Sequence, residues 1–525
     1  MALDLAVMLD TLSKSSVEIS REERRLAITA ATGVAEMRDH LGKDTKRDIE
    51  AALQNLSGHS DPYNGMLIES LLFSLTEDWV HLENLKPYLA SYDPEFLEAG
   101  GTFMGVRALL FNAHPAVAEQ LRTVFTREFS KRLYDVQLEH IEYLYQRIAE
   151  KKDHEFRRND IVVVLTPQYI GPPHAPSLDV LKFSHQLINQ FNKTVIVIAT
   201  ALCSHACEGA IAPAFRAARN DDLVGAKSIK HEGVEIPFLF CGDGILSDIA
   251  MQQCLLAIDS ISPEMILCVG EPAVVAEPFH ERSFTFMYPL GHGIPHVRNI
   301  NFHVYSDPCP DERALMEREG ITERCRFVQQ YDLAIKPPSN SLTREQFQIP
   351  PQSFVFSVVG TRLFNDVDET FLEMLEKIAA DDRAHFMFAG NFHDYENKIL
   401  PYVKLRGRTT FIGFQEDIMA VHNITDVFLN PARSGGGTGV VYALQAALPV
   451  LSLPVGDGGL VAEAFPQIDD YDHLAEIALE MIGDSSLREK YQDIARAEAP
   501  RFTGQLMKQI LEEFDKFAET KTRVS

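Results

Sequence analysis

Asn430-Pro-Ala-Arg-Ser-Gly-Gly-Gly-Thr-Gly-Val-Val-Tyr-Ala-Leu-Gln-Ala-Ala-Leu-Pro-Val450 is the stretch of this 525-residue chain on which the fold prediction rests. An apolar run at 426–430 precedes its glycines, an apolar-rich segment at 440–447 follows them, and a second apolar run occupies 449–453. A strand, a glycine turn, a helix and a second strand form a βαβ unit. The stretch therefore predicts a parallel α/β sheet in the C-terminal part of the chain.

The glycine turn of this unit stands where the helix is expected to begin. It consists of Gly435, Gly436 and Gly437, and Thr438 follows. The first amides of a helix have no partner inside the helix and carry a partial positive charge. Glycines allow a ligand to approach such amides closely. We therefore expect a phosphate to bind here; the alternative is a purely structural turn.

Upstream of this unit the chain changes from helical to alternating patterns. Residues 1–150 are predicted to be helical, with a long amphipathic segment at 117–147. Strand-like apolar runs then alternate with helical segments, which is typical of α/β sheets that bind ligands beyond the carboxyl ends of their strands. The expected strands occupy 161–165, 194–199, 236–240, 265–269, 284–288 and 301–305 in a first series, and 354–359, 385–389, 410–412 and 426–430 in a second.

Two changes of composition divide the chain. A charged stretch occupies 150–160, and Lys336-Pro-Pro-Ser-Asn340 separates the two series of strands. The predicted fold class is α/β, with two tandem Rossmann-like domains behind an all-α N-terminal extension. The expected parts are a helical region at 1–155, a first Rossmann-like domain at 156–338, a second one at 339–500 and a C-terminal helix at 501–525.

Charge and composition exclude several classes of partner. The chain has 75 acidic and 49 basic residues, a net charge of −26, which argues against nucleic acid or an anionic membrane as its partner. No run of 18 apolar residues predicts a membrane span, and the first residues lack the basic region of a signal peptide. The seven scattered cysteines are expected to be reduced core thiols. A cytoplasmic protein is therefore predicted.

Neither a metal nor a bound cofactor is expected. Cys203-Ser-His-Ala-Cys207 offers too few ligands for a zinc site, and no second cluster of similar spacing follows. The sequence has no Gly-x-Ser-x-Gly elbow, no Walker lysine loop and no His-Glu-x-x-His pair, and its glycine turn lacks the Gly-x-Gly-x-x-Gly spacing of dinucleotide-binding folds. The common signatures of hydrolases, nucleotide triphosphatases, zinc proteases and dehydrogenases are thus missing.

Several short segments of the C-terminal half stand in an order that is informative. They are Val359-Gly-Thr-Arg-Leu363, Phe388-Ala-Gly-Asn391, Phe411-Ile-Gly-Phe414, Val427-Phe-Leu-Asn-Pro431, Gly435-Gly-Gly437 and Leu448-Pro-Val450. In this order they resemble the nucleotide-sugar glycosyltransferases with two facing Rossmann-like domains (the GT-B fold), especially the family-four-like branch. The resemblance implies that fold and the transfer of a sugar from a nucleoside diphosphate to an acceptor.

The resemblance also implies a donor site. The donor diphosphate would be contacted by Gly360 and Arg362, and the nucleobase would lie against Gly413 and Phe414. The phosphates would meet the turn Gly435, Gly436 and Gly437 with Thr438.

This chain departs from the family pattern around the turn. The family usually has a glutamate before the glycines and another one eight residues later, where Ser434 and Tyr442 stand here. Tyr442 could donate one hydrogen bond to the donor ribose but cannot accept two as a carboxylate does. The lysine that often follows the Arg362-Leu363 pair is also absent. Arg433 could supply positive charge in its place.

Glycosyl transfer further needs an oriented acceptor and, in inverting enzymes, a base that takes the acceptor's proton. His174, Glu271 and His292 each lie near the end of a predicted strand of the first series, where the ligand-binding edge of the sheet is expected. They are the candidate catalytic residues. The alternative for each histidine is a purely structural role.

We therefore expect a metal-independent glycosyltransferase that uses a nucleotide sugar, foremost a UDP-sugar, and a protein, a polysaccharide or another acceptor. The helical region could bind that acceptor, another partner or a second copy of the chain as a homo-oligomer. The alternative is a catalytically degenerate GT-B-fold protein that binds a partner or assists an active relative. The absence of carboxylates at 434 and 442 favours this alternative.

Overall fold

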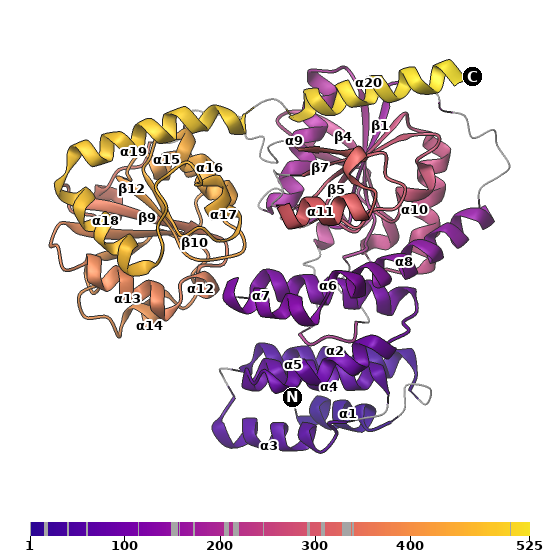
Figure 1. The fold of residues 1–525 in the computed structure, drawn as a ribbon, viewed down its shortest axis with the longest axis horizontal. Helices are drawn as coiled ribbons and strands as arrows, with labels where there is room; N and C mark the ends of the chain where they lie inside the picture. Colours follow the sequence, from indigo (N-terminus) through magenta and orange to yellow (C-terminus); the bar gives the residue numbers. More distant parts are fainter. Residues whose placement is uncertain are drawn as a thin grey trace. The chain divides into compact units, whose positions relative to one another are not determined.

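The computed structural model describes residues 2–524 except 15–18, 39–40, 59–60, 114, 149–155, 157, 172–173, 204–208, 214–219, 245, 291–293, 306–309, 328–337, 339–340 and 504–505. The chain forms two units (Figure 1). The first unit comprises Met1–Leu110, Ala118–Phe327 and Met507–Ser525, and the second comprises Phe111–Val117 and Val328–Leu506. The helical region, the first α/β sheet and the C-terminal helix thus share one unit.

The N-terminal region is helical, as predicted. Its helices are α1 (Ala2–Leu12), α2 (Arg21–Glu36), α3 (Lys43–Gln54), α4 (Pro62–Thr76), α5 (Val80–Ser91), α6 (Phe96–Asn112), α7 (Pro115–Val124) and α8 (Arg127–Ile148). The sequence sets the bounds of α4: Asp61 accepts the Asn64 N–H (3.1 Å) at its start, and Glu77 ends it in a left-handed conformation. Because α4 buries residues on all its faces, it is the central helix of the region.

The first sheet has the strand order β3-β4-β2-β1-β5-β6-β7-β8. All described neighbours pair in parallel except the hairpin of β3 and β4. The central strands are buried on both faces, as strands between two helical layers require. The bounds are β1 (Ile161–Thr166), β2 (Thr194–Ala199), β3 (Ser228–His231), β4 (Val234–Phe240), β5 (Met265–Val269), β6 (Phe284–Tyr288), β7 (Phe302–Tyr305) and β8 (Cys325–Phe327), with helices α9 (Ala175–Asn189), α10 (Asp248–Ile261) and α11 (Pro310–Arg318).

The second sheet is parallel throughout, in the order β11-β10-β9-β12-β13. Successive residues of β9 and β10 enter separate hydrophobic clusters: Phe356 and Phe386 belong to one, and Val355 and Met387 to the other. Both faces of the sheet are therefore covered. Its strands are β9 (Phe354–Gly360), β10 (Ala384–Gly390), β11 (Thr409–Phe411), β12 (Val427–Asn430) and β13 (Val450–Ser452), and its helices are α12 (Leu363–Asp366), α13 (Glu369–Ile378), α14 (Tyr395–Ile399), α15 (Ile418–His422), α16 (Gly437–Gln445), α17 (Gly456–Val461), α18 (Tyr471–Gly483) and α19 (Ser485–Glu498).

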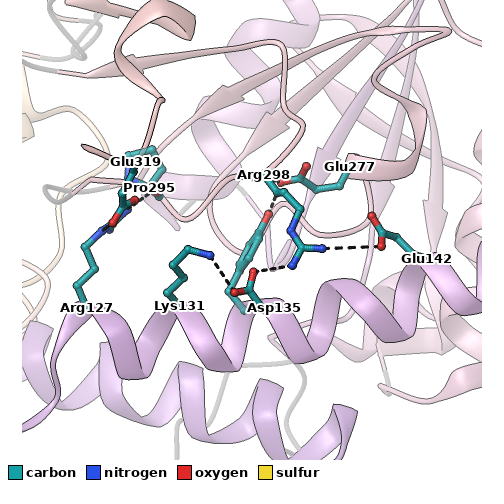
Figure 2. A network of polar contacts seen from close by, with 9 residues as sticks. Arg127, Lys131, Asp135, Glu142, Glu277, Pro295, Arg298 and Glu319 are labelled. Carbon is teal, nitrogen blue, oxygen red and sulfur yellow. Dashed lines mark hydrogen bonds and ion pairs between the residues drawn. The ribbon is translucent and has the colours of Figure 1, made fainter. Parts of the chain in front are cut away.

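Within the first unit, α8 is bound to the loops of the first sheet by polar side chains (Figure 2). Arg127 binds the Glu319 carboxylate through two nitrogens, at 2.7 and 2.6 Å. The Tyr134 hydroxyl donates to the buried carboxylate of Glu277 at 2.6 Å. Bidentate and buried charged hydrogen bonds of this kind fix orientation as well as adding stability. The helical region and the first α/β sheet are therefore one structural body.

The C-terminal helix also belongs to the first unit. This helix, α20 (Leu506–Val524), packs Phe514 and Phe517 against Phe284 of β6, with ring centroids 5.8 and 5.2 Å apart. Arg158 pairs with Asp515 at 2.6 Å. The chain therefore returns to its first α/β sheet after completing the second.

The predicted fold class, two Rossmann-like α/β sheets behind an all-α region, is confirmed. The predicted domain boundaries stay predictions, because the composition changes at 150–160 and 336–340 lie largely outside the described residues. β3 and β8 were not expected. No helix in the described part of the chain is long and apolar enough to cross a membrane. The five described cysteines are buried, as expected for core thiols.

A buried histidine makes the stability of the second unit depend on pH. His422, at the end of α15, is 1% exposed, and burial lowers its pKa from 6.5 to about 3. The unfolded chain binds a proton below about pH 6.5 and the folded chain does not, so stability is present above that pH and is lost as the pH falls. At pH 5 the loss from His422 alone is about 2 kcal/mol.

Urea unfolding at pH 7 and pH 5 measures this effect. We expect the wild type to lose more stability between the two pH values than His422→Leu does, by about 2 kcal/mol, because leucine binds no proton. Equal losses in the two proteins would show that His422 is not held neutral.

Candidate functional site

The glycine turn lies where the sequence predicts it, between β12 and α16. Gly436 precedes the helix with a φ of +97°, a conformation that favours glycine. The carbonyl of Ser434 accepts the Asp457 N–H at 3.0 Å, so the start of α17 holds the turn in place. The first amides of α16, those of Gly437 and Thr438 among them, are not used by the helix itself. The turn therefore has the geometry of an anion-binding helix start.

The other predicted donor-site residues gather at the same edge of the second sheet. Parallel strands end at one edge, and Gly360 ends β9 while Gly413 follows β11. The Gly390 N–H at the end of β10 donates to the Gly413 carbonyl at 2.8 Å, and the Asn391 N–H donates to the Gly360 carbonyl at 3.1 Å. Phe414, next in the chain, keeps 55% of its surface exposed. An exposed aromatic ring and the glycine turn are thus presented on one edge.

Arg362 is the predicted ligand of the donor diphosphate. It lies just after β9 and immediately precedes α12, with a side chain 20% exposed. Its guanidinium lies 3.5 Å from the Asp366 carboxylate and 4.1 Å from the ring centre of Phe111, which belongs to the same unit. The Ser434 hydroxyl donates to the Phe111 carbonyl. A phosphate bound at this edge would contact Arg362 beside its two present neighbours, Asp366 and Phe111.

Arg433 points into the protein. Its side chain is 5% exposed and donates to the Asn430 side-chain oxygen (3.0 and 2.7 Å), to the Val359 carbonyl (2.9 Å) and to Asp366 (3.2 Å). Burial lowers its pKa. The predicted role of Arg433 as a replacement charge beside the donor stays a prediction, but most of its donors are already engaged inside the domain.

Tyr442 occupies the position of the family's second glutamate. It lies on α16, five residues after Gly437, and packs part of its ring against the main hydrophobic cluster of the second unit. Its role towards the donor ribose stays a prediction.

In the first unit, Glu271 lies two residues after the end of β5. Its carboxylate is 5% exposed, forms an ion pair with Arg107 of α6 and accepts the His296 N–H at 2.8 Å. The imidazole of His296 lies 3.7 Å from the same carboxylate, and burial lowers its pKa to about 3. Sequence reasoning missed Arg107 and His296. The only signal for His296 was its place four residues after His292 in a histidine-containing loop.

His174 precedes α9 as its N-terminal flanking residue. Its Nδ1 lies 3.0 Å from the Ser177 hydroxyl oxygen, which accepts the Ile170 N–H at 3.0 Å. Burial lowers the pKa of His174 to about 4, so the ring is neutral at pH 7. If the Ser177 hydroxyl donates to Nδ1, the proton of the ring stays on Nε2, which then donates rather than accepts. His292 lies outside the described residues, and the catalytic roles of all three residues stay predictions.

Among the described residues, no group of three or more histidine, cysteine, aspartate or glutamate side chains could hold a metal ion. Of Cys203, His205 and Cys207, which the sequence analysis does not expect to form a metal site, only Cys203 is described, and it is buried.

Several solved structures are similar to this chain. A glycosyltransferase from Rickettsia africae ESF-5 is 13% identical, with 68% of this chain and 99% of that chain covered and a TM-score of 0.49. A mutant O-GlcNAc transferase of Thermobaculum terrenum is 16% identical, with coverage of 99% and 98% and a TM-score of 0.45. HepE of Anabaena, in complex with UDP and glucose, is 14% identical, with coverage of 68% and 99% and a TM-score of 0.46. No curated protein matches the chain.

The sequence of the second sheet matches a protein family. Residues 354–463 match the family described as Glycosyl transferases group 1. This range begins with β9 and ends just beyond α17, so it contains every predicted donor-site residue from Gly360 to Tyr442. The resemblance inferred from the short segments is confirmed. Residues 354–463 therefore carry a Glycosyl transferases group 1 domain, in a chain that has two tandem Rossmann-like α/β sheets.

Proposed function

We propose that this chain transfers a sugar from a nucleoside diphosphate, foremost a UDP-sugar, to a protein or polysaccharide acceptor. The observation that carries the proposal is the glycine turn at the start of α16, which lies on the same sheet edge as Arg362. Sugar transfer leaves a diphosphate that gains negative charge in the transition state. Helix-start amides and a guanidinium stabilise such charge where they are fixed in advance.

We further propose that the transfer needs no metal ion. Arg362 and the amides of Gly437 and Thr438 together supply a positive charge and several hydrogen-bond donors for the leaving diphosphate. In enzymes that use a divalent metal, the metal carries this charge instead. The Phe414 ring and the Gly413 backbone would contact the nucleobase, and Tyr442 would donate to the ribose.

For the acceptor side we propose Glu271, His174 and His292. Glu271 and His174 lie near the carboxyl ends of β5 and β1, the ligand-binding edge of a parallel sheet. With Nδ1 accepting from Ser177, His174 would orient the acceptor by donating from Nε2. The large helical region, fixed to the same unit through α8, supports a macromolecular acceptor because it adds surface to this side of the enzyme. A cytoplasmic setting is proposed as well, and the burial of the described cysteines supports it.

Donor hydrolysis tests the proposed function. The full chain is incubated with UDP-, GDP- and dTDP-sugars, with and without EDTA, and released nucleoside diphosphate is measured. We expect release from a UDP-sugar that EDTA does not reduce. Loss of release in EDTA would contradict metal independence alone. Binding of UDP, GDP and dTDP is measured separately. If none of the three binds at millimolar concentration, the enzyme proposal is contradicted.

The second candidate is a catalytically degenerate protein of the same fold that binds a partner or assists an active relative. Ser434 and Tyr442 favour it, since they replace both of the family's carboxylates. UDP binding without turnover of any sugar nucleotide, in the presence or absence of candidate acceptors, would support this candidate.

A further inference from the structure

A buried polar chain connects the end of β12 with Arg362 inside the second unit. It starts at Asn430, whose side-chain oxygen accepts two N–H groups of Arg433. Arg433 continues to Asp366, with 3.2 Å between the guanidinium and one carboxylate oxygen. The other carboxylate oxygen lies 3.5 Å from the guanidinium of Arg362. One carboxylate, 8% exposed, therefore joins a buried arginine to the arginine that is expected to meet the donor.

Most of the hydrogen-bond donors of Arg433 are engaged from within the domain. Its Nε and one terminal nitrogen donate to Asn430, the same terminal nitrogen also donates to the Val359 carbonyl, and the other terminal nitrogen donates to Asp366. A guanidinium has five N–H groups, and four are engaged here. Breaking such contacts in a buried site leaves charge without a partner, which is strongly unfavourable. Arg433 is therefore not available to turn towards a phosphate.

At several glycines of this region, the backbone lies very close to the side chains of Asn430 and Arg433. A Cβ added at Gly360 would lie 2.5 Å from an Arg433 terminal nitrogen, and one at Gly436 would lie 2.5 Å from Arg433 Nε. A Cβ at Gly458 would lie 2.2 Å from the Asn430 side-chain nitrogen. These glycines are thus required by the close approach of the backbone to Arg433 and Asn430, whether or not a ligand is bound.

We propose that Asn430, Arg433 and Asp366 form a clamp that positions Arg362 and the glycine turn for the donor diphosphate. The inference rests on the proposed function, because it assigns the clamp to the donor site. Asp366 is a positioning residue: it holds the Arg362 guanidinium in place before the donor arrives. Pre-ordering a long side chain removes part of the entropic cost of binding. Arg433 supports the turn from the interior of the domain and is not a phosphate ligand.

The test compares the affinities of the full chain for UDP and UMP, measured by calorimetry. The ratio of the two affinities reports the interaction with the second phosphate, which is the group Arg362 would hold. A general disturbance of the domain weakens both nucleotides, whereas a misplaced Arg362 lowers the ratio. We expect Asp366→Asn to lower the ratio about five- to tenfold, and to lower the thermal midpoint as well because it removes the counter-charge of buried Arg433. Asp382→Asn, the same change at an exposed carboxylate of this unit, should leave the ratio unchanged.

Two further variants keep the test decisive. In an Arg362→Ala background, Asp366→Asn should have no additional effect on the ratio, because its effect acts through Arg362. Arg433→Lys should lower the thermal midpoint, because it removes buried hydrogen bonds, and it should also lower the ratio through Asp366. If Asp366→Asn does not fold, Asp366→Glu, which keeps the charge but moves it, should lower the ratio in its place.

The outcomes separate the clamp from the proposed function. A wild type that prefers UDP over UMP through Arg362, with an unchanged ratio in both Asp366 variants, would overturn the clamp alone. An Arg433→Lys protein of unchanged midpoint with a reduced ratio would show that Arg433 contacts the phosphate directly, which would also overturn it. A wild type that binds neither nucleotide would overturn the proposed function together with the clamp.

Discussion

Gly456→Ala is expected to lower the free energy of unfolding of the second unit by about 2–5 kcal/mol. A Cβ at this position would lie 1.9 Å from the Arg433 carbonyl oxygen and 2.8 Å from that of Ser434. Both atoms belong to the backbone of the turn, which cannot yield as a side-chain tip does. Overpacking costs about 1–3 kcal/mol, and the φ of +60° adds about 1–2 kcal/mol for a residue with a side chain.

Far-UV circular dichroism during urea unfolding measures this loss. The single tryptophan, Trp79, lies in the first unit, so its fluorescence is not the signal to use. Gly483→Ala at the end of α18 is the matched control, because a Cβ there meets nothing within 4 Å. We expect the control to be as stable as the wild type. Equal stability of Gly456→Ala and Gly483→Ala would contradict the packing of α17 against the turn.

Arg362→Ala is expected to weaken UDP binding about 10- to 100-fold. Hydrogen bonds between charged groups contribute about 1.5–3 kcal/mol each, and alanine removes both the charge and the donors. Arg362→Lys keeps the charge but loses the planar fork, so we expect an intermediate affinity. Isothermal titration calorimetry with the folded variants measures these affinities.

The control for Arg362 is Arg496→Ala, an exposed arginine on α19 of the same unit that pairs with Asp493. Surface pairs of this kind contribute little to stability. We expect its UDP affinity to equal that of the wild type. UDP affinity that survives Arg362→Ala unchanged would remove the diphosphate site from this edge, although the fold would stand.

Much of the second α/β sheet could be predicted from the sequence, because its central strands β9, β10 and β12 are short, apolar and largely buried. The runs at 354–359 and 385–389 are β9 and β10, and the turn after β12 starts α16 as expected. The edge strands were harder to predict from the sequence. β3 (Ser228–His231) contains Lys230 and His231 and pairs with one neighbour in a hairpin, so it has neither the apolar run nor the clear alternation that marks a strand.

The sequence predicted which residues lie at the candidate site, but not which way their side chains point. The short segments that end the strands located the edge of the sheet, because local sequence determines where strands end. Whether Arg433 points outwards or inwards depends on Asp366 and Val359, which are more than 60 positions away in the sequence. In the same way, the ion pair of Glu271 depends on Arg107 from α6. Contacts of this kind arise only when distant elements pack, and no local pattern reveals them.

The two missing carboxylates have structural consequences that the sequence did not show. At position 434 the serine hydroxyl donates to the Phe111 carbonyl, a contact that a glutamate, which has no proton to donate, could not make at neutral pH. At position 442 the tyrosine ring packs partly into the hydrophobic cluster. The departures from the family pattern are thus accommodated by the local packing, and the glycines and Arg362 remain in place beside them.

Hydrogen–deuterium exchange of the full chain with and without UDP tests the central claim, that the donor binds at the glycine turn of the second α/β sheet. We predict slower amide exchange at 434–440, where the turn meets α16, and at 411–415, where Phe414 is exposed. A bound phosphate would engage the amides at the start of the helix and so protect them. Unchanged exchange at 434–440 in the presence of saturating UDP would contradict the account.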